Sequence, residues 1–189
     1  MRMNFDLPKA VYIGGKALSI RYDFRVILEI ITMLNDIELT NADKAEALLT
    51  MFYVNPEEID DVQQAVTECY SFIDQGSKQK KKQPRLIDWE QDFDYIVAPV
   101  NRVLGYEIRS VDYDAETNTG GLHWWTFLSA YMEIGSECLL SQIVSMRDKL
   151  ARNKKLEKYE REWLRHNRHL VDLPQKYTAD EDELIKKWI

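Results

Sequence analysis

Hydrophobic residues recur along most of the chain at intervals of three and four, the spacing that places them on one face of an α-helix. Before residue 106, this pattern predicts four helices, over residues 23–34, 40–52, 55–73 and 88–105. Each is expected to begin at a side chain that favours a helix N-cap: Asp23, Thr40, Asn55 and Asp88. The third has the fullest start signal, because Asn55 is followed by a proline and then by two glutamates.

An alternating pattern, typical of a β-strand, lies near the N-terminus. Hydrophobic residues alternate with other residues on both sides of Gly14-Gly15, which predicts a β-hairpin over residues 11–20. The apolar side chains of one face are Val11, Ile13, Leu18 and Ile20. Because a lone hairpin is marginally stable in water, we expect this face to pack on the helices.

The stretch richest in aromatic residues, 122–147, predicts two helices joined at Gly135, the second with Ser136 as its cap. Trp124 and Trp125 are adjacent, so their side chains diverge by about 100° on a helix. We therefore expect one indole in the core and the other against a second helix or a partner.

The remaining segments complete a mainly α fold: a multi-helix domain with a small N-terminal β-hairpin packed on the helices. Residues 150–170 read as a charged helix with a thin apolar stripe. The expected organisation is a hairpin plus helices over 1–75, a basic linker or loop over 76–87, a Trp-rich helical part over 88–170 packed on the first as one domain, and a short amphipathic tail over 171–189. The apolar residues of this tail are Leu184, Ile185 and Trp188.

Composition narrows the classes of partner. The formal net charge of −7 over 189 residues argues against a general nucleic-acid binder, which is normally basic. The lysines of residues 76–87 have no aromatic residues interleaved to stack on bases, so a solvated connector is favoured there over a nucleic-acid patch. No apolar run approaches the ~20 residues that span a bilayer, so no membrane contact is expected.

Candidate chemistry is sparse. His166 and His169 are three residues apart but have no third ligand nearby. The alternating carboxylates of residues 112–116 resemble a calcium loop, but the sixth position is Thr117 and the twelfth is His123, so the loop lacks its glycine and glutamate. No nucleophile or phosphate-loop motif is present. We therefore expect no catalytic residue, metal or cofactor, and we expect the chain not to be an enzyme.

Aromatic residues are the remaining signal, with five tryptophans and ten tyrosines. Tryptophan is over-represented at binding hot spots because it buries a large area with few rotatable bonds. Trp163 and Trp188 lie in sparsely apolar helical segments, where core filling explains them less well. The candidate protein-binding residues are His123, Trp124, Trp125, Phe127, Tyr131, Arg147, Trp163 and Trp188.

Several of these residues carry a resemblance to a known family. His123-Trp124-Trp125 followed by Phe127, with Arg147 closing the next helix, resembles a family of tail assembly chaperones from long-tailed phages and prophages of Gram-positive bacteria. Two weaker elements agree with it in order: Asp23-Phe24-Arg25 at the first helix, and Asp88-Trp89 with Asp92 at the middle helix. One departure is Gly105-Tyr106-Glu107-Ile108, where the family usually has a Gly-Ile-Asp-Leu-like segment.

The resemblance implies a non-enzymatic function in the cytoplasm of the host bacterium. Proteins of this kind are thought to coat the helical tape-measure protein and to recruit tail-tube subunits around it, so those two proteins are the expected partners, with self-association as a further expectation. An alternative is a small structural or head–tail connector protein that stays in the virion. A small enzyme would instead require a polar pocket around His123 with Asp112 or Asp114.

Overall fold

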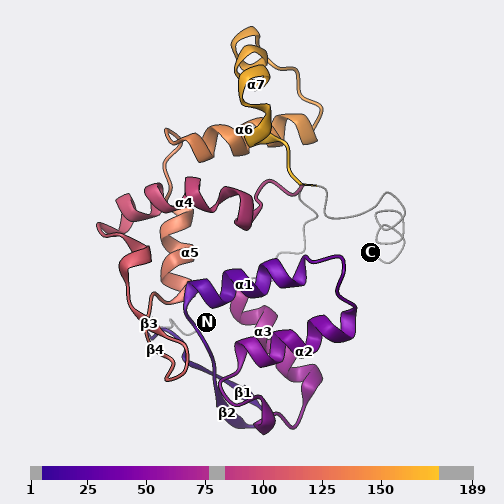
Figure 1. The fold of residues 1–189 in the computed structure, drawn as a ribbon, viewed down its shortest axis with the longest axis vertical. Helices are drawn as coiled ribbons and strands as arrows, with labels where there is room; N and C mark the ends of the chain where they lie inside the picture. Colours follow the sequence, from indigo (N-terminus) through magenta and orange to yellow (C-terminus); the bar gives the residue numbers. More distant parts are fainter. Residues whose placement is uncertain (1–5, 77–83, 175–189) are drawn as a thin grey trace.

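The computed structural model describes residues 6–76 and 84–174, and within them the fold is mainly α, as predicted. The elements in chain order are β1 (Ala10–Ile13), β2 (Lys16–Ser19), α1 (Phe24–Leu34), α2 (Asn41–Phe52), the 3-10 helix η1 (Pro56–Glu58), α3 (Val62–Ile73), α4 (Trp89–Leu104), the 3-10 helix η2 (Ile108–Ser110), β3 (Tyr113–Asp114), β4 (Thr119–Gly120), α5 (Trp124–Met132), α6 (Leu139–Ala151) and α7 (Lys158–Val171). The molecule is elongated: α1 to α3 and the first hairpin form one end, α4 and α5 the middle, and α6 and α7 the other end (Figure 1).

The predicted N-terminal hairpin is confirmed. β1 and β2 pair antiparallel around Gly14-Gly15, with Val11 opposite Leu18. Ile13, Leu18 and Ile20 are buried in the helical core, as expected for the apolar face. The hairpin is also fixed to α3, because the Gly14 backbone N–H donates to the Gln64 side chain at 2.8 Å.

Three helix starts are confirmed together with their caps. The Asp23 side chain accepts from the Arg25 backbone N–H at the start of α1, and Thr40 forms a capping box with Asp43 at the start of α2. Asp88 caps α4, and Gly105 ends it in the left-handed conformation that favours glycine. The expected polar connection after α4 contains η2 and the short β3–β4 hairpin.

The start of the third helix was predicted wrongly. Asn55-Pro56 opens only the 3-10 turn η1, and α3 begins at Val62. The physical reason is that the Asn55 side chain donates to Glu58 instead of capping the backbone, whereas Asp61 accepts from the Gln64 backbone N–H at 2.9 Å.

Two boundaries near the C-terminus also differ from the prediction. Cys138, not Ser136, is the N-cap of α6, because the Cys138 and Ser141 side chains both donate to the Gly135 carbonyl and hold the preceding turn. The charged stretch over residues 150–170 is not one helix. α6 ends at Ala151, and α7 starts afresh from a capping box between Glu157 and Glu160.

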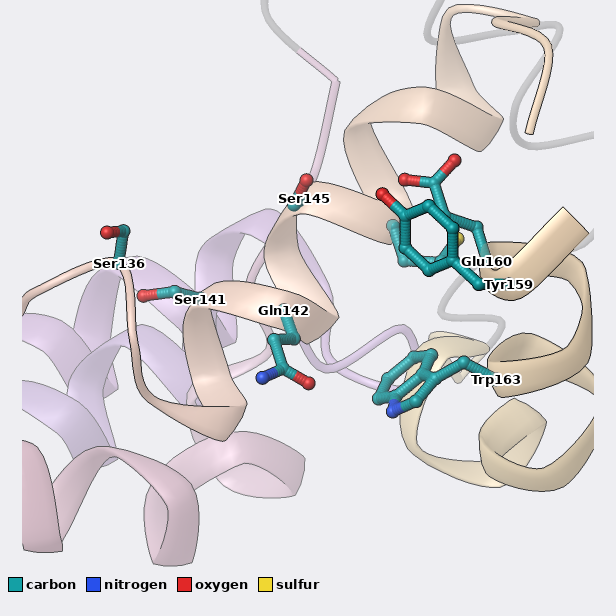
Figure 2. Close-up of a pocket in the computed structure, with 8 residues that line it drawn as sticks. Ser136, Ser141, Gln142, Ser145, Tyr159, Glu160 and Trp163 are labelled. Atoms are coloured by element: carbon teal, nitrogen blue, oxygen red, sulfur yellow. The ribbon is translucent and has the colours of Figure 1, made fainter. Parts of the chain in front are cut away.

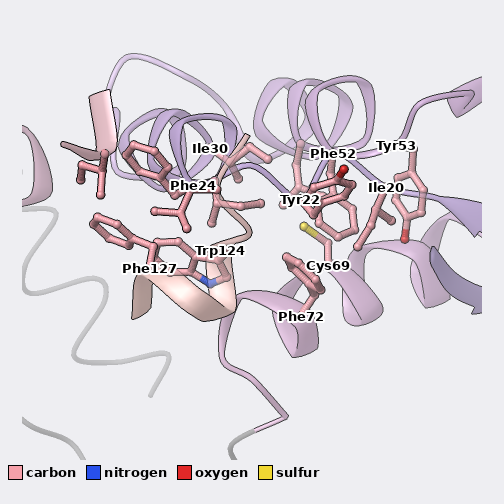
Figure 3. Packing of buried hydrophobic residues seen from close by; sticks show 14 of the residues in the cluster. Ile20, Tyr22, Phe24, Ile30, Phe52, Tyr53, Cys69, Phe72, Trp124 and Phe127 are labelled. Atoms are coloured by element: carbon pink, nitrogen blue, oxygen red, sulfur yellow. The ribbon is translucent and has the colours of Figure 1, made fainter. Parts of the chain in front are cut away.

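A hydrophobic cluster draws on both halves of the chain (Figure 3). Phe24 of α1 stacks on Phe127 of α5 with ring centroids 4.8 Å apart, and Trp124 stacks on the same Phe127 ring at 5.6 Å. At the hairpin end, Phe52 packs edge-on against Tyr53. In the part of the chain that the structure describes, no helix is both long and apolar enough to span a membrane.

Candidate functional site

The His-Trp-Trp element forms a junction between the starts of two helices that are distant in sequence. Asp23 and His123, the N-caps of α1 and α5, face each other in an antiparallel β-bridge. The Phe24 N–H donates to the Leu122 carbonyl at 3.0 Å, and the Trp124 N–H donates to the Tyr22 carbonyl at 2.7 Å. In both bonds, a backbone N–H at the start of one helix, which has no acceptor within that helix, donates to a carbonyl just before the other helix.

Asp23 holds this junction through both carboxylate oxygens. Oδ1 accepts from the Arg25 backbone N–H at 3.0 Å, and Oδ2 accepts from the Leu122 N–H at 2.8 Å. Gly121 lies against this carboxylate: a Cβ there would sit 2.3 Å from Oδ2, and its φ is +77°. Glycine is therefore required at position 121 for close approach as well as for conformation.

His123 is a structural residue in this arrangement. Its Nδ1 accepts from the Trp125 backbone N–H at 3.0 Å, so Nε2 carries the proton and donates to the Pro8 carbonyl at 2.9 Å. Burial lowers the pKa of the imidazole below its ordinary value. Both ring nitrogens are occupied, which leaves no free basic nitrogen for proton abstraction from a substrate.

The two adjacent tryptophans close the end of α3. Trp124 Nε1–H donates to the Ile73 carbonyl at 2.9 Å, and Trp125 Nε1–H donates to the neighbouring Phe72 carbonyl at the same distance. These carbonyls belong to the last turn of α3, where a helix leaves its acceptors unpaired. Trp124 lies in the core, and the Trp125 ring stacks on Phe72, which confirms the predicted division between the core and a second helix.

Arg147 makes a second buried junction, between α4, α6 and the end of α7. Its guanidinium forms a two-point ion pair with Asp92, at 2.5 Å and 3.0 Å. Its remaining N–H groups donate to the carbonyls of Leu86, Leu170 and Val171 at 2.7–2.9 Å. All five donors of the side chain are thus used, as a buried guanidinium requires.

Most of the predicted binding residues are therefore not on the surface, which corrects our expectation of an aromatic face around the His-Trp-Trp element. The side chains of His123, Trp124, Phe127 and Arg147 are buried. Trp125 and Tyr131 are half-buried. Burial raises the pKa of Tyr131 to about 12, and its ring centroid lies 5.0 Å from that of Trp89. Trp188 lies outside the described residues.

Trp163 is also half-buried, and its exposed part borders an open groove. It lines a groove of about 490 Å³ between α6 and α7, where it faces Gln142 across the opening (Figure 2). Tyr159, one turn earlier on α7, is 70% exposed, and Met146 of α6 forms part of the lining. Small polar side chains on the α6 side complete the groove: Ser136, Ser141 and Ser145.

The groove is supported by an ion pair at its end. Lys149 of α6 bonds to Glu160 of α7, and this bond is the main cause that lowers the pKa of the Glu160 carboxyl. The other Glu160 oxygen accepts from the Glu157 backbone N–H at 2.9 Å. Because both oxygens are occupied, Glu160 positions α7 against α6 rather than offering a free carboxylate to the groove.

A second groove, of about 590 Å³, lies between α1 and α4. Its apolar lining comes from Leu28 and Met33 of α1 and from Trp89 and Phe93 of α4, and the exposed carboxylates of Glu29 and Glu90 lie at its edge. We did not predict this groove.

Sequence reasoning missed Tyr159 and the α1/α4 groove as surface features. The available signal for Tyr159 was its spacing of four from Trp163 in a thin apolar stripe, which leaves the pair little core to enter. For the α1/α4 groove the signal was weaker. Leu28 and Phe93 each belong to an apolar stripe that is indistinguishable from ordinary core packing until the helices are placed together.

The acidic and thiol side chains of the described residues were the remaining candidates for chemistry. Within residues 6–76 and 84–174, no group of three or more His, Cys, Asp or Glu side chains is arranged to hold a metal ion. The Asp114 carboxylate accepts from the backbone N–H groups of Glu116 and Thr117 and so holds the β3–β4 turn. Cys69 is buried, which raises the pKa of its thiol to about 12.

Comparison with known proteins gives one assignment. No curated protein and no solved structure is significantly similar to the chain. The family model described as "Bacteriophage Gp15 protein" matches residues 3–173, which include both buried junctions and the α6/α7 groove. The chain therefore belongs to the family of bacteriophage Gp15 proteins.

Proposed function

We propose that this phage protein is a tail assembly chaperone: a non-enzymatic helical protein of the host cytoplasm that covers the tape-measure protein and recruits tail-tube subunits during assembly. The observation that carries the proposal is the open groove between α6 and α7, lined by Trp163, Tyr159 and Met146. A long tape-measure helix exposes apolar stripes that would aggregate if left bare. An aromatic groove between two helices suits such a stripe in helix-in-groove fashion.

A small-molecule site fits this groove less well. Its volume of about 490 Å³ lies in the range of ligand pockets. However, the carboxylate at its edge, Glu160, is already bonded to Lys149 and to the backbone. The other polar groups are serine hydroxyls, the Gln142 amide, the Tyr159 hydroxyl and the Trp163 indole N–H, which come from the turn before α6, from α6 and from α7. Spaced polar groups beside exposed rings match a polypeptide better than a compact substrate.

The direct test is co-expression of the chain with the tape-measure protein of the same phage, followed by affinity purification at low salt. The wild-type chain should retain the tape-measure protein. The double variant Tyr159→Ala/Trp163→Ala should lose about 30-fold in affinity, equivalent to about 2 kcal/mol, as expected for aromatic hot spots.

A matched control is available at the opposite end of the molecule. Tyr12 on β1 is 67% exposed, close to the 70% of Tyr159, so Tyr12→Ala removes an equally exposed ring. It should leave binding unchanged. Equal losses for Tyr12→Ala and the double variant would show that the α6/α7 groove is not the binding surface.

The alternative, a structural or connector protein retained in the particle, is separated by mass spectrometry of purified virions. A chaperone should be absent from finished particles, whereas a connector should be present in a fixed ratio to the tail proteins. Light scattering after size exclusion tests self-association, which would set the ratio in which the chain covers the tape measure.

A further inference from the structure

Helix α7 is divided by a kink at Asn167, where φ is −118° and ψ is 22°, outside the helical range. The Asn167 side-chain N–H donates to the Trp163 carbonyl at 2.9 Å, the acceptor that in a regular helix receives the backbone N–H of residue 167. A side chain that competes for a backbone acceptor in this way is a recognised cause of a kink. α7 therefore consists of a first segment, residues 158–166, and a second segment, residues 168–171.

The second segment is fixed to the body of the molecule by side chains of α4 and α6. Arg147 of α6 donates to the carbonyls of Leu170 and Val171 at 2.7 Å and 2.8 Å. Gln91 of α4 donates to the carbonyl of Asp172 at 3.1 Å. These acceptors lie at the end of α7, where a helix leaves its carbonyls unpaired. Because Arg147 is buried, this end cannot leave α4 and α6 without exposing its bonds to water.

The first segment is attached much more weakly. Within residues 158–166, the buried side chain is the carboxylate of Glu160, whereas Trp163 and Leu164 are only half-buried. The polar contact that joins this segment to α6 is the ion pair between Glu160 and Lys149. An element with few buried apolar contacts has low local stability. The first segment is therefore the part of α7 that can separate from α6 while the second segment stays in place.

We propose that residues 158–166 swing about Asn167 and so open and close the α6/α7 groove, with the Lys149–Glu160 ion pair as the latch of the closed state. The Lys149 side chain is 31% exposed, and a partly exposed ion pair is weak enough to break without unfolding the chain. Lys158 lies nine residues from the hinge, which is about 14 Å along a helix, so a modest rotation at Asn167 displaces it by several ångströms.

The movement changes the width of the groove directly. Tyr159 and Trp163 line it from the first segment, and Gln142 and Ser145 line it from α6 (Figure 2). A helix that inserts between these two sides binds the open state better than the closed state, so it shifts the population towards the open state. This use of the hinge as a gate rests on the proposed function, whereas the movement itself does not.

Pulsed electron paramagnetic resonance between two spin labels tests the movement in the full chain. The labels are attached at Asp94→Cys on α4 and Lys158→Cys in the first segment, both exposed positions. Cys138→Ser removes the half-buried native thiol, and Cys69 is buried. Lys149→Met should raise the ratio of open to closed molecules about fivefold, as expected for the loss of a partly exposed ion pair. An unchanged distribution of distances would overturn the proposal.

A second pair of labels locates the hinge. Asp94→Cys combined with His169→Cys places the second label on the other side of Asn167, again at an exposed position. With this pair, Lys149→Met should leave the distribution of distances unchanged. If both pairs shifted together, α7 would move as one body, and the hinge at Asn167 would be refuted.

Two further variants separate the latch from a general effect of charge. Lys149→Arg keeps the cation and should keep the groove closed. Arg168→Met removes the cation that pairs with Asp172 on α7, beyond the hinge, and should also leave the distances unchanged. Opening by Arg168→Met as large as that by Lys149→Met would refute the latch. No tape-measure protein is present in these measurements, so a static α7 would refute the gate without bearing on the chaperone function.

Discussion

The two junctions near the middle of the molecule and the α6/α7 groove at its end use the same residue types in opposite ways. At the His123 junction, Trp124 is 2% exposed, and its indole N–H is bonded to a carbonyl at the end of α3. On α7, Tyr159 is 70% exposed and Trp163 borders open space. The comparison shows that richness in tryptophan does not locate a binding surface in this chain. What distinguishes the two regions is whether the ring has a core to enter.

The largest expected effect is on the buried side of this comparison. Trp124→Ala should lower the free energy of unfolding by about 4 kcal/mol, because it opens a large cavity and leaves the Ile73 carbonyl without its donor. Urea unfolding followed by circular dichroism measures the change. A loss below about 1 kcal/mol would mean that the junction around His123 is not the core of the fold.

The second effect concerns the junction that attaches α6. Arg147→Leu should cost about 3 kcal/mol of unfolding free energy, because Asp92 would remain as a buried charge without its partner. The double variant Arg147→Leu/Asp92→Leu should be less destabilised than the single variant, because no charge is left unpaired. Double-mutant unfolding curves check this, and additive losses would contradict the coupling.

A smaller effect should appear in the pH dependence of stability. The pKa of His123 is lowered by burial, so the unfolded chain binds a proton below about pH 6.5 while the folded chain does not. The free energy of unfolding should therefore fall as the pH decreases from about 6.5 towards the lowered folded pKa. The carboxyl groups with lowered pKa values act further down, below about pH 4.5.

The variant His123→Asn provides the control for this pH effect. His123→Asn keeps an N-cap residue but does not titrate. Between pH 5 and pH 7, the free energy of unfolding of the variant should change less with pH than that of the wild type, because the decrease attributed to His123 is absent. Identical curves would show that another group causes the decrease.

The smallest effect on stability is expected at the exposed groove. Trp163→Ala should change the free energy of unfolding by no more than about 1 kcal/mol, since its ring is only partly packed between α6 and α7. The same variant should weaken binding of the tape-measure protein. A loss as large as that of Trp124→Ala would assign Trp163 to the core and remove the contrast between the two regions.

Features within a few residues of one another were predictable. The caps at Asp23, Thr40 and Asp88 work through bonds to backbone groups two or three residues away, so residue type and spacing suffice to identify them. The same holds for the hairpin around Gly14-Gly15. The failure at Asn55 has the same local scale: the Asn55 side chain bonds to Glu58, and Asp61, which we had not considered, caps α3 instead.

By itself, the sequence determined most of the helices and the first hairpin, and it contains the residues on which the resemblance to a phage family rests. The tertiary structure alone decided what those residues do. Asp23 and His123 are 100 positions apart, and so no local pattern could show that they cap two helices against each other. Likewise, Arg147 became a buried partner of Asp92, and Trp163 was left at an open groove. The physical reason is that burial depends on which faces of distant helices meet, whereas a cap depends only on its neighbours in the chain.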